Sequence, residues 1–265
     1  VERSRGLGDV YKRQLGRDTQ DIKYLILTNT HPTQWAGLEA LNKIKPKIIV
    51  HDKGKQALLE GQKFILKNQF PYTSKFGLAM RSSLFSNIKK VKEEFIQPIE
   101  KSETLDLGEE EIIIQPSGGH SQDSLIIHAY QAKCTFIGDE ANIYPDQPSA
   151  LFLDATGNSR RRLKVLQLIE KMNTNVICPG HQTPVPKPFD LYVHNLIFEH
   201  NHTKDTILDL LISVGQAKSL YLAEEVLRIL GVVWKTPYEE LGVAKTTVEC
   251  FLKELESENR VRFIK

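Results

Sequence analysis

Four short apolar runs in this 265-residue chain each end in a loop that carries a histidine or an aspartate. The four side chains are His31 after KYLILTNT, His120 after EIIIQPSGG, Asp139 after CTFIG and His181 after NVICPG. A lone loop histidine is more often a surface residue than a ligand, but a sheet that ends several strands at one edge aims their loops at a common point. Three imidazoles and a carboxylate suit zinc, with iron or manganese as alternatives. We therefore expect a metal-binding or catalytic site at one edge of a sheet.

Helical patterns alternate with the apolar runs. Residues 35–45, 53–65 and 159–172 have apolar residues at helical spacing, and the last of these places Leu163, Leu166 and Ile169 on one face. Strands are predicted within 21–30, 46–52, 111–115, 124–130, 134–140 and 175–181, whereas residues 68–103 read as an irregular excursion. This alternation predicts an α/β or α+β fold over residues 15–195.

The C-terminal part, residues 196–265, has a different pattern. Helices are predicted over 203–215, 220–231 and 244–259, followed by a short strand at 260–265, an order typical of a winged-helix module. The last helix carries more glutamate than lysine, which disfavours DNA binding and favours packing or a homodimer contact.

Composition excludes several classes of protein. A net charge of +2 creates no large field that would attract nucleic acid or a membrane, and no apolar run is long enough to span a bilayer. Three widely spaced cysteines form no disulfide framework, so we expect a cytoplasmic protein. If RNA is a partner, the basic stretches NIKKVK and SRRRLK are where its backbone is expected to lie.

The opening residues 1–14 have no apolar period and no helix cap, and SRGLGDVYKRQ resembles a translated sequencing adapter. We expect the natural sequence to begin near Leu15 as an internal fragment. Judging from typical strand and loop lengths, about 40–50 residues of the fold would precede Leu15.

The four loops resemble the motifs of the metallo-β-lactamase-fold hydrolases, in order. That family's opening motif reads T-H-x-H-x-D-H-x-G-G, of which this chain keeps Thr28, His31 and Gly37. The later motifs are GHSQDS at 119–124, with Asp123 in place of glycine, Gly-Asp at 138–139 and Pro-Gly-His at 179–181. The resemblance implies an αββα sandwich, and the helical tail is similar to that of the β-lactamase-like ribonuclease subgroup.

The family's ligand scheme implies two metal ions bridged by Asp139. The first ion would be held by Asn29, His31 and His120, and the second by Thr33, Gln34 and His181, so the substitutions leave at most one good site. The resemblance then implies a metal-dependent hydrolase of an ester, thioester or phosphodiester, with His31, His120, Asp139 and His181 as catalytic residues and Asn29 as a weak metal ligand. A non-catalytic scaffold of the same fold is the alternative, and the sequence leaves both interpretations open.

Overall fold

The computed structural model describes residues 16, 19–35, 37–38, 44–64, 67, 88–141, 151–232 and 243–264. The segment interpreted as an adapter, residues 1–14, and most of the helix predicted over 35–45 lie outside the described residues. Among the described helices, none has both the length and the apolar character that a bilayer crossing requires.

The first sheet contains three parallel strands in the order β1-β2-β3: β1 (Tyr24–Ile26), β2 (Lys47–His51) and β3 (Ile96–Ile99). Along the chain, α2 (Pro32–Trp35) follows β1, and α3 (Asp52–Glu60) and α4 (Gln62–Phe64) follow β2. A 3-10 turn at Thr19–Asp21 precedes β1, and another at Glu93–Phe95 precedes β3. The prediction that residues 68–103 are irregular is wrong for β3, because pairing with β2 gives this short segment a strand conformation that its own pattern does not demand.

The second sheet has six strands in chain order: β4 (Glu103–Asp106), β5 (Glu111–Pro116), β6 (Leu125–Ala129), β7 (Cys134–Gly138), β8 (Val176–Pro179) and β9 (Val185–Pro186). All neighbours are antiparallel except β7 and β8, which are parallel. The parallel crossover between them contains α6 (Ser159–Lys171), whose first turn is capped by the side chain of Asn158 accepting from the Arg161 amide.

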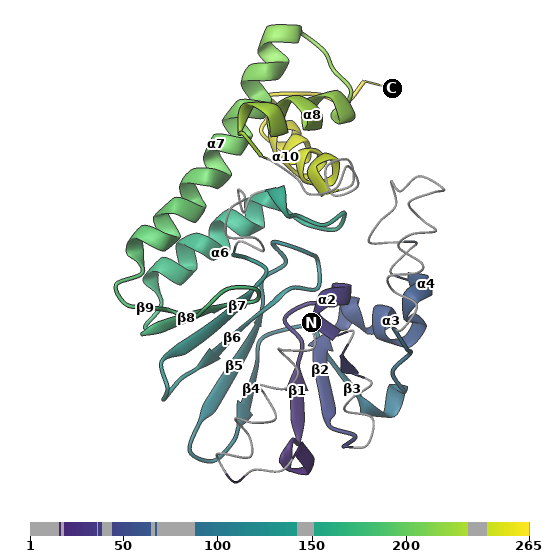
Figure 1. Ribbon diagram of the computed structural model, residues 1–265, viewed down its shortest axis with the longest axis vertical. Helices are drawn as coiled ribbons and strands as arrows, with labels where there is room; N and C mark the ends of the chain where they lie inside the picture. Colours follow the sequence, from purple (N-terminus) through teal and green to yellow (C-terminus); the bar gives the residue numbers. More distant parts are fainter. Residues whose placement is uncertain are drawn as a thin grey trace.

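The two sheets face each other and carry helices on their outer sides (Figure 1). Between the sheets, Ile49 and Ile99 pack with Ile114, Leu125 and Ile127. Outside the second sheet, the β7 and β8 side chains of Ile137 and Ile177 pack against α6 and the start of the next helix, and α3 covers the first sheet through Leu58. This layering is the predicted α/β sandwich, with its apolar core between the sheets and a second apolar layer under the helices on each outer side.

Among the described residues, three helices follow the sandwich: α7 (Asp190–Val214), α8 (Ser219–Ile229) and α10 (Lys245–Ser257). The boundary predicted between residues 195 and 196 falls inside α7, which continues unbroken from the sandwich into the tail. The predicted terminal strand does not form in residues 261–264, where the Phe263 amide donates to a carboxylate oxygen of Glu256 rather than to a neighbouring strand. The described tail is therefore helical, and a winged-helix module remains without structural support.

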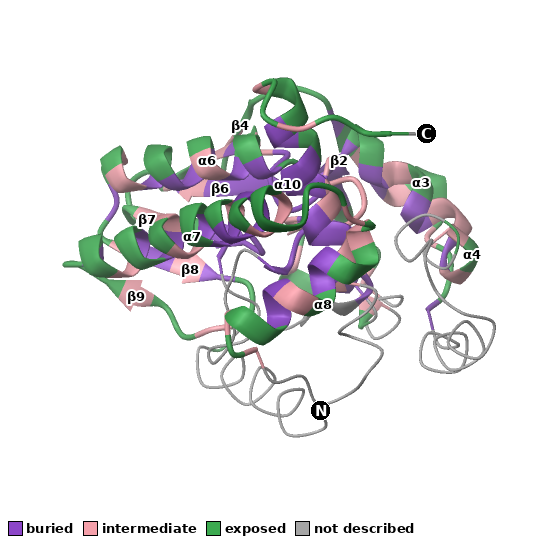
Figure 2. Ribbon diagram, turned by 90° about the horizontal axis from the view of Figure 1, so that it is seen from above, coloured by how far each residue is buried: buried purple, intermediate pink, exposed green. Residues whose placement is uncertain are grey.

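A segment of the sandwich enters the core of the tail. Leu151, Phe152 and Leu153 are buried with Phe251 and other apolar residues of α7, α8 and α10. The hydroxyl of Thr247 accepts from the Leu153 amide, which fixes α10 against this segment. The buried sides of α6, α7 and α10 are the purple faces in Figure 2. The tail helices and the sandwich therefore share a continuous packed interface.

His200 lies inside this interface and is fully buried. Its ring packs against Phe251 at 4.9 Å between centroids, and within the described chain neither ring nitrogen has a hydrogen-bond partner. Nε2 of His200 lies 4.0 Å from Oε2 of Glu254, and the other carboxylate oxygen of Glu254 is paired with Lys204. Burial, with Arg162 and Lys204 nearby, lowers the pKa of His200 from its ordinary 6.5 to about 3.

We expect this histidine to make the fold sensitive to acid. Between pH 6.5 and about 3, the unfolded chain binds a proton at His200 that the folded chain does not, so the free energy of unfolding falls as the pH is lowered. The slope from this one group is at most about 1.4 kcal/mol per pH unit. Urea unfolding at pH 7, 6 and 5 measures how the free energy of unfolding depends on pH. A His200→Phe variant should lose part of the slope, and an unchanged slope would contradict the assignment.

Candidate functional site

The loops that follow β1, β5, β7 and β8 meet around Asp139, which is 4% exposed. Nε2 of His181 lies 3.3 Å from Oδ1 of this carboxylate, and Nε2 of His120 lies 3.7 Å from Oδ2. His31 completes the group, with its ring centroid 6.2 Å from that of His120. The structure thus gathers all four predicted catalytic residues in one cluster, centred on the carboxylate.

Two amide side chains occupy the positions where the family has metal ligands. Nδ2 of Asn29 donates to Oδ2 of Asp139 at 2.9 Å, and Nε2 of Gln34 lies within 3.0 Å of both carboxylate oxygens. Gln34 Nε2 also lies 3.2 Å from Nε2 of His181. Both oxygens of Asp139 therefore accept hydrogen bonds from side chains of the opening loop.

The orientation of the Asn29 amide follows from its two contacts. Its Oδ1 accepts from the backbone amide of His31 at 2.9 Å, and this leaves Nδ2 to face Asp139. Reversing the amide would place oxygen against the carboxylate and nitrogen against an N–H donor, which removes both bonds. Asn29 is fully buried and therefore acts here as a donor to the carboxylate, and its oxygen is already engaged by the backbone.

The charges of the cluster are arranged to keep Asp139 ionised. Burial alone would raise the pKa of this carboxyl, but the His181 hydrogen bond, the two neighbouring imidazoles and the Asn29 amide outweigh it and hold the pKa well below its usual range. The Asp139 hydrogen bond raises the pKa of His181. Burial, reinforced by His120, lowers the pKa of His31 to about 4. His31 is thus neutral at physiological pH, as a metal-bound imidazole must be.

Two acidic residues that were not predicted as site residues hold the loops of the cluster in place. Asp123 accepts from the amide and hydroxyl of Thr30 and from the Ser121 hydroxyl, which ties the His120 loop to the His31 loop. Glu140 accepts from the backbone amide of His120 at 3.1 Å and from the hydroxyl of Ser117. Aspartate at 123, where the family has glycine, is the sequence feature that could have indicated the contact with Thr30.

Backbone proximity explains why glycine precedes His181. A Cβ atom added to Gly180 would lie 2.7 Å from Oδ1 of Asp139 and 3.2 Å from the carbonyl carbon of Gly138. Any larger residue would push directly on the carboxylate at the centre of the cluster. The Pro-Gly-His sequence therefore allows β8 to pass close to the end of β7.

His120 and Gln34 differ in what they offer a metal ion. His120 is 3% exposed, and neither of its ring nitrogens has a hydrogen-bond partner among the described residues, so the imidazole is available as a ligand. By contrast, Gln34 presents an N–H group to Asp139 and His181, where a second ion would need lone pairs. Over the described ranges, no group of three or more His, Cys, Asp or Glu side chains is arranged as a ready metal site.

The basic stretch SRRRLK is only partly available to a polyanion. Arg162 is fully buried near Glu140 and Glu199, whose charges oppose the lowering of its pKa by burial, while Arg160, Arg161 and Lys164 are at least partly exposed. Arg162 is not accessible to a polyanion because the α6 period turns it into the interior, and RNA contact at the exposed residues stays a prediction.

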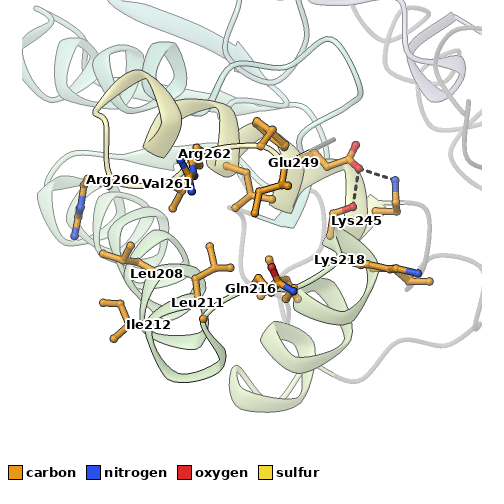
Figure 3. A pocket seen from close by; sticks show the side chains of 18 residues that line it. Leu208, Leu211, Ile212, Gln216, Lys218, Lys245, Glu249, Arg260, Val261 and Arg262 are labelled. Atoms are coloured by element: carbon orange, nitrogen blue, oxygen red, sulfur yellow. Dashed lines mark hydrogen bonds and ion pairs between the residues drawn. The ribbon is translucent and has the colours of Figure 1, made fainter.

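A cavity of about 1170 Å³ lies away from the cluster, between α7, α8, α10 and the terminal segment (Figure 3). Leu211, Ile212 and Leu252 line it with other apolar residues, and cationic side chains such as Arg260 and Lys218 are among its residues. None of the predicted site residues lines this cavity, so it does not belong to the carboxylate-centred cluster.

Comparison with solved structures supports the fold. A metallo-beta-lactamase family protein from Thermus thermophilus matches with a TM-score of 0.70 and 16% identity, covering 96% of this chain and 81% of that one. An archaeal metallo-beta-lactamase superfamily protein from Sulfolobus tokodaii matches at 0.51 and 17% identity, over 86% and 81% of the two chains. A metallo-beta-lactamase from Pontibacter korlensis matches at 0.51 and 14%, over 74% and 76%.

At these identities the structures establish the fold alone, and no curated protein sequence matches closely enough to refine it. The sequence profile of the Metallo-beta-lactamase superfamily matches residues 3–181, which is well over half of the chain. This span contains all four loops of the carboxylate-centred cluster. The chain therefore belongs to the metallo-beta-lactamase superfamily.

Proposed function

We propose that the protein is a divergent metallo-β-lactamase-fold hydrolase that holds at most one metal ion, bound by His31, His120 and Asp139. The observation that carries the proposal is the buried imidazole of His120, whose two ring nitrogens lack hydrogen-bond partners in the described chain. A buried polar group without a partner costs about 1–3 kcal/mol, and coordination to a metal would remove that cost. The neutral state of His31 and the ionised state of Asp139 supply the protonation states that metal ligands need.

The chain's own residues have distinct tasks in this proposal. The metal, zinc or alternatively iron or manganese, would supply a Lewis acid that makes hydroxide from water near neutral pH. His181 lies against Oδ1 of Asp139 and, being partly exposed, can hold a proton beside an entering substrate. Asn29 and Gln34 hold the Asp139 carboxylate in position. The substrate class we propose is an ester, thioester or phosphodiester.

A second candidate function is a scaffold without catalytic activity. It is favoured by the same amide contacts, because Asn29 and Gln34 already satisfy both oxygens of Asp139 without a metal. A buried polar cluster whose hydrogen bonds are satisfied can hold the four loops together without a metal ion. In that case the tail helices would serve assembly, including a homodimer contact.

Metal content distinguishes the two candidates. The full chain is purified, dialysed against zinc and then against buffer, and its metal is measured by elemental analysis beside His120→Ala and Asp139→Ala variants. We expect about one zinc per chain in the wild type and a loss of affinity of at least about 100-fold in each variant, since even outer-shell changes cost 10–100-fold.

His194→Ala is the matched control. This imidazole is exposed on α7, where it contacts Glu170 on α6, and its removal should leave the metal content unchanged. Wild-type protein without zinc would reject the hydrolase and favour the scaffold. If zinc is bound, hydrolysis of p-nitrophenyl acetate, a thioester and bis-p-nitrophenyl phosphate then identifies the bond that is cleaved.

A further inference from the structure

Two cysteine side chains lie in contact on the neighbouring strands that lead to the cluster. Sγ of Cys134, at the start of β7, is 3.4 Å from Sγ of Cys178 on β8. Both thiols are free and partly exposed. The third cysteine, Cys250, is buried in the core of the tail, where its thiol donates to backbone oxygens of Asp154 and Gly157. Only the first two are therefore placed to react with each other.

The register of β7 and β8 determines what a bond between the two sulfurs would do. Cys134 lies opposite Val176, and Cys178 lies opposite Phe136, so the cysteines are diagonal neighbours on one face of the sheet. Diagonal positions are about 7–8 Å apart at Cα in a sheet, whereas disulfides usually span about 4.4–6.8 Å. Since the bonded sulfurs must approach from 3.4 Å to about 2.05 Å, we expect bond formation to displace β7 relative to β8.

That displacement would be transmitted to the cluster because both strands end there. Asp139 follows the last residue of β7, and His181 is two residues beyond the end of β8. The contact between them is only 3.3 Å, and Gly180 already passes close to the Asp139 carboxylate. A small shift of one strand along the other therefore changes the relation of the imidazole to the carboxylate.

We propose that Cys134 and Cys178 form a reversible disulfide that displaces His181 relative to Asp139 and so acts as a redox switch on the cluster. The regulatory role of this disulfide rests on the proposed function, whereas the formation of the disulfide and the displacement of His181 do not. A disulfide that strains the strands is more easily reduced than a structural one, which suits a switch.

The chemistry balances with a small-molecule disulfide such as glutathione disulfide as the oxidant. The Cys178 thiolate attacks one glutathione sulfur, the glutathione S–S bond breaks, and glutathione thiolate leaves with the electron pair. The Cys134 thiolate then attacks the mixed disulfide at the Cys178 sulfur and releases the second glutathione. Two protein thiols become one disulfide, and one glutathione disulfide becomes two glutathione molecules. Burial and the contact with Cys178 raise the pKa of Cys134 to about 11, and the products are the same whichever of the two cysteines attacks first.

The test uses the 265-residue chain without metal, equilibrated in glutathione buffers of increasing oxidised fraction. Peptide mapping under non-reducing conditions should find a Cys134–Cys178 cross-link that accumulates with oxidation and is lost on adding dithiothreitol. Cys250→Ser should cross-link as the wild type does, whereas Cys134→Ser and Cys178→Ser should not. In the same samples, the ring proton signals of His181 should shift by NMR while those of the remote, exposed His194 stay in place.

Two results would overturn the proposal. One is wild-type protein that carries only glutathione adducts, with no cross-link. The other is a complete cross-link that leaves the His181 signals where they are in the reduced chain. Because no metal is present, neither result depends on whether the cluster binds zinc, so a failure here is separate from a failure of the proposed hydrolase.

Discussion

Replacing Asn29, Thr33 and Gln34 together by His, Asp and His is expected to raise the metal content from at most one ion to about two per chain. The substitutions restore the opening motif of the superfamily hydrolases and remove the two amides that donate to Asp139. Asp139 then has lone pairs available to bridge two ions, and imidazole and carboxylate replace amide and hydroxyl as ligands. Elemental analysis after zinc dialysis, with both proteins prepared in parallel, measures the difference.

The control for this variant is Asn29→Ala/Gln34→Ala, which removes the amide donors but adds no ligand. It should bind no more than one ion, because freeing the carboxylate does not supply the missing imidazole and aspartate. Equal metal content in the restored variant and the wild type would show that the substituted loop is not what limits metal binding. Two ions in the wild type would refute the proposed stoichiometry.

Truncating Phe251 to alanine is expected to lower the free energy of unfolding by about 3–5 kcal/mol, the usual cost of removing a buried phenylalanine. Phe251 is fully buried where α10 meets the sandwich segment 151–153, and its ring also contacts His200. The backbone of this segment reaches the cluster, since the Asp154 amide donates to the carbonyl of His120. Urea unfolding followed by circular dichroism measures the loss.

A truncation of an exposed leucine serves as the control, because it shows how much stability is lost when no buried packing is removed. Leu191 is 72% exposed on α7, and Leu191→Ala should change the stability by no more than about 0.5 kcal/mol. If Phe251→Ala instead produced two separate transitions, the tail and the sandwich would be independent units, contrary to their shared core. A loss similar to that of Leu191→Ala would contradict the burial of Phe251.

Several elements of the fold could be predicted because their local pattern and their tertiary environment agree. The strands β2, β5, β6, β7 and β8 and the helices α6, α8 and α10 lie within or close to the predicted ranges. Their apolar periods match the faces that they bury. β3, β4 and β9 were not predicted, because their sequences IQPI, ETLD and VP contain no apolar run, and each depends on a neighbouring strand. By contrast, a strand was predicted at 260–265 but does not form in residues 261–264, where the strand-like pattern has no neighbouring strand to pair with.

The sequence by itself determined the superfamily fold and the identity of the clustered side chains, because these depend on apolar runs and on loop residues at fixed positions along the chain. Only the tertiary structure decided what Asn29 and Gln34 do: they face Asp139 as hydrogen-bond donors, a property of amide orientation that a one-letter code does not contain. The proximity of Cys134 and Cys178, 44 residues apart in the chain, likewise arises from the register of two strands. Such contacts depend on pairing and packing between distant segments, which local sequence patterns do not encode.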